Sequence, residues 1–377
     1  MTTVQQVITL MEQLAPRSYA ESWDNVGLMV GDRNAMVTGV LTTLDVTEET
    51  ISYAIEHDCN LIISHHPLIF KGLKQLSCDT TQGRMIHKLI QHKIAVYSAH
   101  TNLDIAPGGL NDMLAERLGL IDVKGFIKTG EDALYKITTF VPENAADAVR
   151  HAMGAAGAGK IGNYEHCSFS IHGEGRFIGN EDSNPVIGEA GALTVAAEVQ
   201  VNAIVDGTHL SQVVEAMKET HPYEEVAYEV VSLVEPKGSI QYLGRIGRLP
   251  NALNLDTFRE WVQEALPDAN IRFAGVAPQE IQSIALCSGA GAEFIKDAAR
   301  LHVDAYITGD VKYHDAQLAK ELGLLVVDAG HFGTESIVAR GLCDYLLSQD
   351  VPVPVKAFTE QNDFFFFFFF IFLQQIG

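Results

Sequence analysis

The sequence predicts an α/β protein made of two outer halves, with a different kind of module inserted between them. In residues 1–124, and again from about 241 to 356, short apolar runs alternate with helical patterns. This alternation is typical of βαβ units around a mostly parallel sheet. The middle of the chain instead follows the order β-α-β-β-α-β, which is the order of a ferredoxin-like α+β module.

The change of pattern divides the 377 residues into four parts. Residues 1–127 form the first α/β half, residues 128–235 the insert, residues 236–363 the second half and residues 364–377 a tail. The tail contains ten consecutive apolar residues, FFFFFFFIFL, whereas a helix that spans a bilayer needs about 20. We interpret this tract as a translated homopolymer or a frameshift that replaces the natural end, and not as a membrane anchor.

The first half begins with the pattern of an amphipathic helix, MTTVQQVITLMEQLAP, which lacks the basic segment and apolar core of a signal peptide. Three apolar runs follow and are predicted to be buried strands: MVTGVLTTLDV, CNLIISHH and KIAVYSAHTNLD. The second half repeats this rhythm with IQSIALCSG, HVDAYITGD and GLLVVDAGHFGTE. In each half a strand ends in polar residues, a helix follows, and the next strand ends in A-H or A-G-H.

The insert begins with a strand and a helix, YKITTFVPENAADAVRHAMGAAGAG. CSFSIHGEGRFIGN is then predicted to be an alternating strand broken by glycines. AEVQVNAIVDGTHLSQVVEAMKETHPYEEVAYEVVSL is predicted to form a strand, a helix and a strand. We find no cluster of metal-binding residues in this polar, glycine-rich segment.

Charge and cysteine content limit the partners and the compartment. A net charge of −22 argues against general binding to the phosphates of nucleic acids. The five cysteines are widely spaced and include no C-x-x-C pair, which favours a reducing, cytoplasmic environment over a disulfide framework. We expect a cytoplasmic globular protein that acts neither on bulk nucleic acid nor in a membrane.

Polar side chains end four of the predicted strands. In open α/β sheets, binding sites lie at the carboxyl ends of the strands, so we expect these side chains to meet in one crevice. The four groups are Ser64 to His66, His100 to Asp104, Gly309 to His314 and Asp328 to Glu335. His, Asp and Glu side chains gathered in this way are typical of a metal site with nitrogen and oxygen ligands.

The adjacent histidines have a structural interpretation as well as a ligand interpretation. Neighbours in an extended strand point to opposite faces. His65 and His66 can therefore serve one site only if the chain turns there, which Pro67 makes plausible. Asp104 could equally cap a turn or a helix.

The candidate residues of the second half also have a structural interpretation beside the ligand interpretation. His331 could be an ordinary loop histidine, and Glu335 a solvated carboxylate that the helix dipole favours. Their H-x-x-x-E spacing puts both side chains on one face if a helix begins at His331. Because all of these candidate residues follow strand ends, we favour the metal-site interpretation.

Five candidate ligands, His65, His66, Asp104, His331 and Glu335, are more than one tetrahedral ion needs. The surplus predicts two divalent metal ions that share a bridging carboxylate, and we expect each of the adjacent histidines to take a different metal. The ligand types suit Zn, Fe, Mn or Ni without choosing among them. His100 is the candidate for a general acid or base beside the metals.

Two further segments have weaker signals. Asp310, Lys312 and His314 could position a substrate, although we favour an ordinary strand–helix junction. CSGAGAEFIKDAAR (residues 287–300) places glycines before a helical pattern, where backbone N–H groups can hold an anion. It lacks a Walker lysine and the G-x-G-x-x-G spacing, so a tight strand-to-helix turn explains it better.

Six motifs taken together resemble the YbgI/YqfO dinuclear-metal-centre family, also called NIF-three-like proteins or GTP cyclohydrolase 1 type 2 homologues. The motifs are SWDNVGLMVGD, SHHPLIF, AHTNLD, GGLND, ITGDVKYHDA and DAGHFGTE. Residues 157–179 and 221–230 resemble the insert of the longer members, a module similar to the PII/CutA signalling fold. The resemblance covers residues 1 to about 363 and ends at the poly-Phe tract.

The resemblance implies one NIF-three-like unit formed by the two halves. It implies that His65, His66, Asp104, His331 and Glu335 are the metal ligands, with His100 beside them. It also implies a homo-oligomer in the form of a toroidal hexamer. The GTP cyclohydrolase label implies a metal-dependent hydrolase that acts on a nucleotide or pterin-type small molecule. The alternative is a non-enzymatic, metal-dependent regulatory or scaffold protein whose insert senses a ligand.

Overall fold

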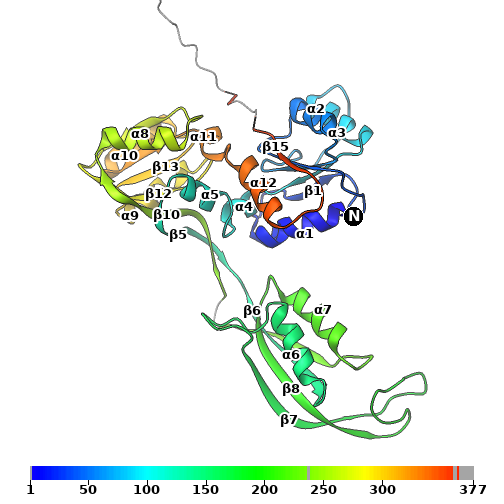
Figure 1. Cartoon of the computed structure of the whole chain (residues 1–377). Helices are drawn as coiled ribbons and strands as arrows, with labels where there is room; N and C mark the ends of the chain where they lie inside the picture. The colour runs from blue at the N-terminus through cyan, green and yellow to red at the C-terminus, as the bar shows by residue number, and fades with distance from the viewer. Residues whose placement is uncertain (1, 236–237, 360–362, 365–377) are drawn as a thin grey trace, which may run out of the picture. The chain divides into compact units, whose positions relative to one another are not determined.

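The computed structural model describes residues 2–235, 238–359 and 363–364. The chain forms two compact units (Figure 1). One unit contains Met1–Thr129 together with the chain from Gln241 onwards, and the other contains Gly130–Ile240. The first unit is therefore built from two stretches that the second unit separates in the sequence.

A five-stranded sheet in the first unit has the order β1-β4-β3-β2-β15. β15, β2, β3 and β4 are parallel, and β1 is antiparallel to β4. All residues of β2, β3 and β4 are buried, which explains why the sequence shows unbroken apolar runs here instead of alternation. The strands are β1 (Gly27–Val30), β2 (Val40–Thr43), β3 (Leu61–Ser64), β4 (Ala95–Ser98) and β15 (Val355–Ala357).

A six-stranded sheet in the same unit has the order β11-β14-β13-β12-β10-β5. Its central strands β12, β13 and β14 are parallel, whereas β10 and β11 pair antiparallel with β12 and β14. The strands are β5 (Ile121–Glu131), β10 (Ile240–Leu253), β11 (Arg272–Gly275), β12 (Ile281–Leu286), β13 (Ala305–Thr308) and β14 (Leu325–Asp328).

The sequence predicts a mostly parallel sheet, whereas this unit has two sheets that are parallel in part. Apolar runs identify buried strands, but they do not reveal which strands pair or in which direction. The two strand–helix–strand repeats, β3-α3-β4 and β13-α10-β14, are present as the alternation predicts.

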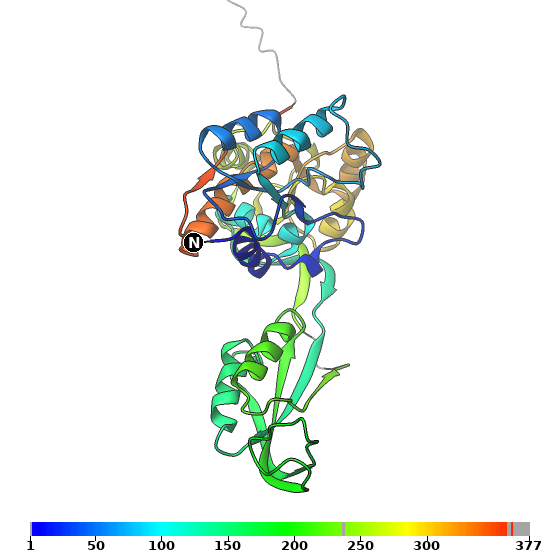
Figure 2. The same cartoon turned by 90° about the vertical axis from the view of Figure 1, so that its right-hand side faces the viewer.

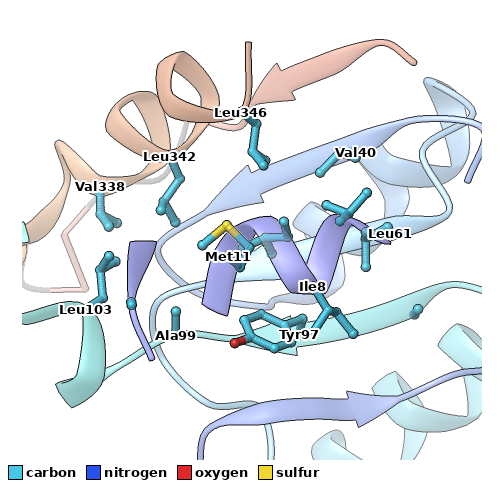
Figure 3. Packing of buried hydrophobic residues seen from close by; sticks show 14 of the residues in the cluster. Ile8, Met11, Val40, Leu61, Tyr97, Ala99, Leu103, Val338, Leu342 and Leu346 are labelled. Carbon is cyan, nitrogen blue, oxygen red and sulfur yellow. The ribbon is translucent and has the colours of Figure 1, made fainter. Parts of the chain in front are cut away.

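Helices from both ends of the chain pack on the five-stranded sheet. α1 (Val4–Leu14) begins after Thr3, whose side chain forms a capping box with the third residue of the helix. Leu342 and Leu346 of α12 (Val338–Ser348) belong to the same hydrophobic core as Ile8 and Met11 of α1 (Figure 3). The chain from α12 to β15 thus returns to the first sheet, where β15 pairs with β2.

The other helices of this unit connect or cover the strands. They are η1 (Arg17–Tyr19), α2 (Glu48–Glu56), α3 (Thr81–Gln91), α4 (Thr101–Ile105), α5 (Leu110–Arg117), α8 (Leu255–Ala265), η2 (Ala292–Phe294), α9 (Ile295–Arg300), α10 (Tyr313–Leu322) and α11 (His331–Glu335).

The second unit is a four-stranded antiparallel sheet with two helices on one face (Figure 2). Its chain order is strand, helix, strand, strand, helix, strand, and its sheet order is β7-β8-β6-β9. Residues of both helices and of the two central strands form a single hydrophobic core. The elements are β6 (Leu134–Pro142), α6 (Ala146–Ala155), β7 (Ser168–Phe177), β8 (Thr194–Asp206), α7 (Leu210–Thr220) and β9 (Tyr228–Ser232).

The poly-Phe tail falls almost wholly outside the described residues. Only Phe364 of residues 364–377 is described, and it is exposed. Within the described parts of the chain, every helix is too short or too polar to cross a bilayer.

Candidate metal centre

The two adjacent histidines lie just beyond the end of β3. The strand stops at Ser64, and the backbone bends at His65 and His66, before Pro67 is reached. Their N–H groups donate to the carbonyls of Thr43 and Leu44 at 3.1 and 3.0 Å. Because of this bend, both imidazoles face the same side, with ring centroids 5.2 Å apart. The turn that brings both side chains to one site is thus made by the histidines themselves.

His65 is fully buried, and one of its ring nitrogens has no hydrogen-bond partner among the described residues. Its Nδ1 lies 2.9 Å from the carbonyl oxygen of Ala99. A carbonyl can only accept, so Nδ1 carries the proton of the neutral ring and Nε2 presents its lone pair. That Nε2 lies 3.7 Å from Oδ1 of Asp104 and 3.8 Å from Oε1 of Glu335.

Both ring nitrogens of His66 contact carboxylates. Its Nδ1 lies 2.8 Å from Oδ1 of Asp45, and its Nε2 lies 2.9 Å from Oε2 of Glu335. The Nε2 atom of His331 lies 3.4 Å from Nε2 of His66 and 3.1 Å from the same Glu335 oxygen. His66, His331 and Glu335 therefore point donor atoms at a common centre, within 4.8 Å of one another.

Glu335 joins the two sets of donors. α11 begins at His331, so the four-residue spacing puts His331 and Glu335 on one face, as predicted. The Glu335 carboxylate is almost completely buried. Its Oε1 faces His65, and its Oε2 faces His66 and His331. One carboxylate thus presents a different oxygen to each group of side chains.

The spacing of these atoms fits metal ligation. Ligands about 2.1 Å from one tetrahedral ion lie roughly 3.4 Å from one another. The separations of 3.7 and 3.8 Å around His65, and of 2.9, 3.1 and 3.4 Å around His66, fall on both sides of that value. The buried, unpaired Nε2 of His65 is a polar atom that an ion would satisfy.

Carboxylates also contact the Nδ1 atoms of two of these histidines. Asp45 contacts Nδ1 of His66, and Asp310 contacts Nδ1 of His331 at 2.9 Å. Such partners orient a ligating imidazole and raise its basicity. Asp45 was not predicted, although it lies two residues beyond the end of β2 and thus satisfies the strand-end rule. Asp310 was considered for substrate positioning, whereas the structure shows that it contacts His331.

His100 lies beside this cluster with its own carboxylate partner. A ring nitrogen of His100 is within 4.8 Å of ring nitrogens of His65 and His66. Its Nδ1 lies 2.9 Å from Oδ1 of Asp24. Burial would raise the pKa of Asp24, but hydrogen bonds from His100 and Thr101 lower it to about 2. Asp24 is therefore ionised at neutral pH and holds the His100 ring in one orientation.

Asp104 reaches the cluster from α4, the short helix that follows His100. It is buried, and Ser288 donates a hydrogen bond to its Oδ1 at 3.3 Å. Asn111 donates to the backbone carbonyl of Asp104 and accepts from the N–H of Ser288. The turn after β12 is thereby tied to Asp104.

The glycines of that turn form one wall of the site. Gly289 has φ +59°, and a Cβ built there would lie 2.2 Å from Oε1 of Glu335. Its N–H donates to the Thr334 hydroxyl at 2.9 Å. The expected tight turn is present and leads into η2 and α9. The sequence did not reveal that its glycine makes room for the carboxylate.

Lys312 and His314 are exposed at the beginning of α10. The Asp315 carboxylate accepts a hydrogen bond from the backbone N–H of Lys312 at 3.0 Å. This contact is typical of the ordinary strand–helix junction that the sequence analysis favoured.

The charges in the cluster shift one another's pKa values. Burial would lower the pKa of His66, but hydrogen bonds to Asp45 and Glu335 raise it to about 10. The hydrogen bond to Glu335 raises the pKa of His331 to about 9. Burial would raise the pKa of Glu335, but contacts with the imidazoles hold it well below its usual range. Metal ions would therefore have to replace protons on these histidines.

The pKa values of His65 and Asp104 are shifted as well. Burial would lower the pKa of His65, but the charges of Asp104 and Glu335 raise it above its ordinary value. Burial raises the pKa of Asp104, and the charge on His65 offsets this only in part. An ion beside Asp104 would supply the positive charge that this buried carboxylate lacks.

The sequence profile of the family described as Duf34/NIF3 (NGG1p interacting factor 3) matches residues 2–363. The chain belongs to the Duf34/NIF3 family. A GTP cyclohydrolase 1 type 2 homolog of Bacillus subtilis (strain 168) is 42% identical over 361 residues, which cover 95% of this chain and 96% of that relative. The family resemblance predicted from the motifs is thus confirmed.

Solved structures of Duf34/NIF3 relatives have a similar fold. A Bacillus cereus protein related to NIF3 is 38% identical, with a TM-score of 0.85 over 97% of this chain and 99% of that chain. A Staphylococcus aureus protein is 33% identical, with a TM-score of 0.72 over 97% and 99%. This Duf34/NIF3 chain is therefore a mixed α/β protein with several sheets and a His/Glu cluster suited to metal.

Proposed function

We propose that the cluster holds two divalent metal ions and that the chain is a metal-dependent hydrolase. The observation that carries this proposal is the division of the Glu335 carboxylate between two sets of donors. His65 and Asp104 would complete one set, and His66 and His331 the other. Zn, Fe, Mn and Ni all accept such nitrogen and oxygen ligands. Ions held in this way act as Lewis acids on a substrate and on water.

His100 is the proposed general acid or base. The ionised Asp24 carboxylate accepts from Nδ1 of His100, so the other ring nitrogen is left for proton transfer at the cluster. Thr101 fixes Asp24 in turn, because both its N–H and its hydroxyl donate to Asp24 at 3.1 and 2.6 Å. The His100 ring can therefore give or take a proton at its other nitrogen while it keeps its orientation.

Exposed aromatic side chains beside His100 support a substrate with a planar ring. Trp23 is 59% exposed and Phe70 is 42% exposed, although large aromatic side chains are usually covered. Their ring centroids lie 6.0 Å apart, and Trp23 meets the His100 ring edge-on at 6.3 Å. A nucleotide or pterin ring could stack here. The name of the Bacillus subtilis relative is consistent with such a substrate.

The remaining family features belong to the same proposal. We propose that residues 1–127 and 236–363 act as one NIF-three-like unit around the metals, and that residues 128–235 are a ferredoxin-like insert of the PII/CutA kind. The strand order of the second unit supports the insert. We further propose a toroidal homohexamer, and a cytoplasmic location that the five free cysteines support.

A metal-loading screen tests the hydrolase. The chain is loaded separately with Zn, Fe, Mn and Ni, and each form is incubated with GTP, other nucleotides and pterins. We expect turnover with at least one metal, and a loss of turnover in both His65→Ala and Glu335→Ala. Glu260→Gln, an exposed change on α8, serves as the control. Wild type that binds metal but is inert with every substrate would contradict the hydrolase and favour a regulatory role.

A further inference from the structure

The second unit contains a large cavity that lies entirely within Gly130–Ile240. Its volume is about 1000 Å³, which is at the upper end of the range of roughly 300–1,000 Å³ for small-molecule sites. It is lined by the end of β7, the loop that follows it, part of β8 and the segment before β9. Phe140, Phe177 and Tyr223 supply aromatic surface to it.

A buried carboxylate faces this cavity. Glu198 of β8 is 8% exposed and lines the cavity. The Tyr223 hydroxyl donates to its Oε1 at 2.8 Å. Among the residues that the structure describes, no hydrogen-bond donor reaches its Oε2. Because Glu198 lines the cavity, Oε2 can accept a hydrogen bond from a group that enters it from outside the chain.

Neighbouring residues hold Glu198 in this position. His221 bonds through Nε2 to the Phe140 carbonyl at 3.0 Å, and its Nδ1 accepts from the N–H of Tyr223 at 3.1 Å. This double contact fixes the segment that carries the Tyr223 hydroxyl. A Cβ on Gly175 would lie 2.2 Å from Oε2 of Glu198. The glycine on β7 therefore leaves the space that the carboxylate occupies.

The charges of the residues that line the cavity favour a ligand of one charge over the other. Five carboxylates line the cavity, against one arginine and no lysine. That arginine, Arg176, is already paired with Glu174 at 2.7 Å. The carboxylates are Glu174, Asp182, Glu198, Glu224 and Glu225. An anionic ligand such as a phosphate would be repelled, whereas a cation would be attracted.

We infer that this cavity binds an organic cation with an amidinium, guanidinium or amine head and a flat or apolar body. The head would lie against Oε2 of Glu198 and form a charge-assisted hydrogen bond. The body would pack on Phe177 and Tyr223, where the ring faces also favour a positive charge. This site is separate from the metal centre, and the inference does not depend on the proposed hydrolase.

Three small molecules of similar shape but different charge test whether binding depends on the charge of the ligand. Benzamidine has a cationic head, benzamide is its neutral isostere, and benzoate has the opposite charge. Each is titrated into the full-length chain in a calorimeter at millimolar concentrations. We expect saturable binding of benzamidine, at least ten-fold weaker binding of benzamide, and no binding of benzoate.

Two variants test the location. Glu198→Gln keeps the shape and should weaken benzamidine binding at least ten-fold. Gly173 pairs directly with Glu198 across the strands, so its side chain would point to the same face, where a Cβ meets no atom within 4 Å. Gly173→Leu should therefore fill the cavity without strain and abolish binding, while Glu198 keeps its charge.

The control is Glu229→Gln, an exposed carboxylate on β9 that does not line the cavity, and it should bind as wild type does. Absence of benzamidine binding to the wild type would overturn the inference. So would equal binding to the wild type, Glu198→Gln and Gly173→Leu. Preferential binding of benzoate would show that the charge assignment is wrong.

Discussion

His66 and Glu335 lie 269 residues apart in the sequence, and Nε2 of the histidine lies 2.9 Å from Oε2 of the glutamate. His66 follows β3 of the five-stranded sheet, whereas Glu335 follows β14 of the six-stranded sheet. The candidate metal centre therefore forms only when the two sequence stretches of the first unit have folded against each other.

Replacing the shared carboxylate should affect both groups of donors. In Glu335→Gln, one oxygen becomes an amide nitrogen that cannot ligate a metal. We expect the metal content to fall from two ions towards one or none per chain, and any hydrolytic turnover to fall at least 100-fold. Metal analysis after dialysis measures this, with Glu260→Gln as the control. Unchanged metal content in Glu335→Gln would rule out its role as a bridge.

Asp45 should act through His66. Because Asp45 orients the imidazole through Nδ1, Asp45→Asn should weaken metal binding by about 10- to 100-fold without removing a ligand. Competition with a chromophoric chelator gives the affinity. Asp344→Asn, an exposed aspartate of α12, should bind metal as the wild type does. Equal affinities in both variants would show that the Asp45 contact does not support the site.

Gly289 should be needed for the position of Glu335. Gly289→Ala would place a Cβ 2.2 Å from Oε1 of Glu335, so we expect reduced metal binding together with reduced stability. Gly323→Ala is a matched control, since Gly323 also has positive φ, at +70°, but a Cβ there meets no atom within 4 Å. Both variants carry the backbone cost of roughly 1 kcal/mol. Equal metal binding in the two would contradict the steric explanation.

The metal-free protein should lose stability as the pH rises above neutrality. The pKa of His66 is raised to about 10 and that of His331 to about 9. A histidine whose pKa is higher in the folded than in the unfolded protein stabilises the fold. This stabilisation is complete below the unfolded-state pKa, near 6.5, and is lost as the pH rises through the folded-state values of about 9 and then about 10. Urea unfolding of chelator-treated protein between pH 6 and pH 10 measures it.

Glu335→Gln provides the control for this pH dependence. It removes the carboxylate that raises both histidine pKa values, so the decline of stability with pH should be smaller in the variant. An equally steep decline in the variant and the wild type would contradict the assignment of the effect to this cluster.

Trp23 should contribute to substrate binding and not to metal binding. Stacking on one aromatic ring contributes about 1–3 kcal/mol per base, so Trp23→Ala should weaken binding of GTP or a pterin by about ten-fold or more. Metal content should not change. Equilibrium dialysis measures both, and Tyr313→Ala, which removes a ring that is 82% exposed on α10, is the control. Unaltered affinity in Trp23→Ala would remove the aromatic support for a planar substrate.

Much of the candidate site could be predicted from the sequence, because its residues obey a local rule. His65, His66, His100, Asp104, His331 and Glu335 follow strand ends, and the structure brings all six side chains into one region of the first unit. The H-x-x-x-E spacing was informative because α11 begins at His331. Their roles as ligands and as acid or base stay predictions.

What could not be predicted depends on contacts between distant segments. Asp24 lies in the motif SWDNVGLMVGD but was assigned no role, since only the folded chain places it beside His100. Gly289 was expected only to make a tight strand-to-helix turn, and its contact with Glu335 was not predicted. Glu198 occupies a polar position in an alternating strand, a pattern usually typical of an exposed face, whereas the folded unit buries it. The division into two sheets depends likewise on strand pairing that apolar runs do not encode.

Anomalous diffraction from crystals of the Mn- or Zn-loaded protein tests most directly whether Glu335 bridges two metal ions. We predict two anomalous peaks about 3.5–4 Å apart, one beside His65 and Asp104 and the other beside His66 and His331, with one Glu335 oxygen at each. A single peak, or peaks that Glu335 does not contact, would show that Glu335 does not bridge two ions.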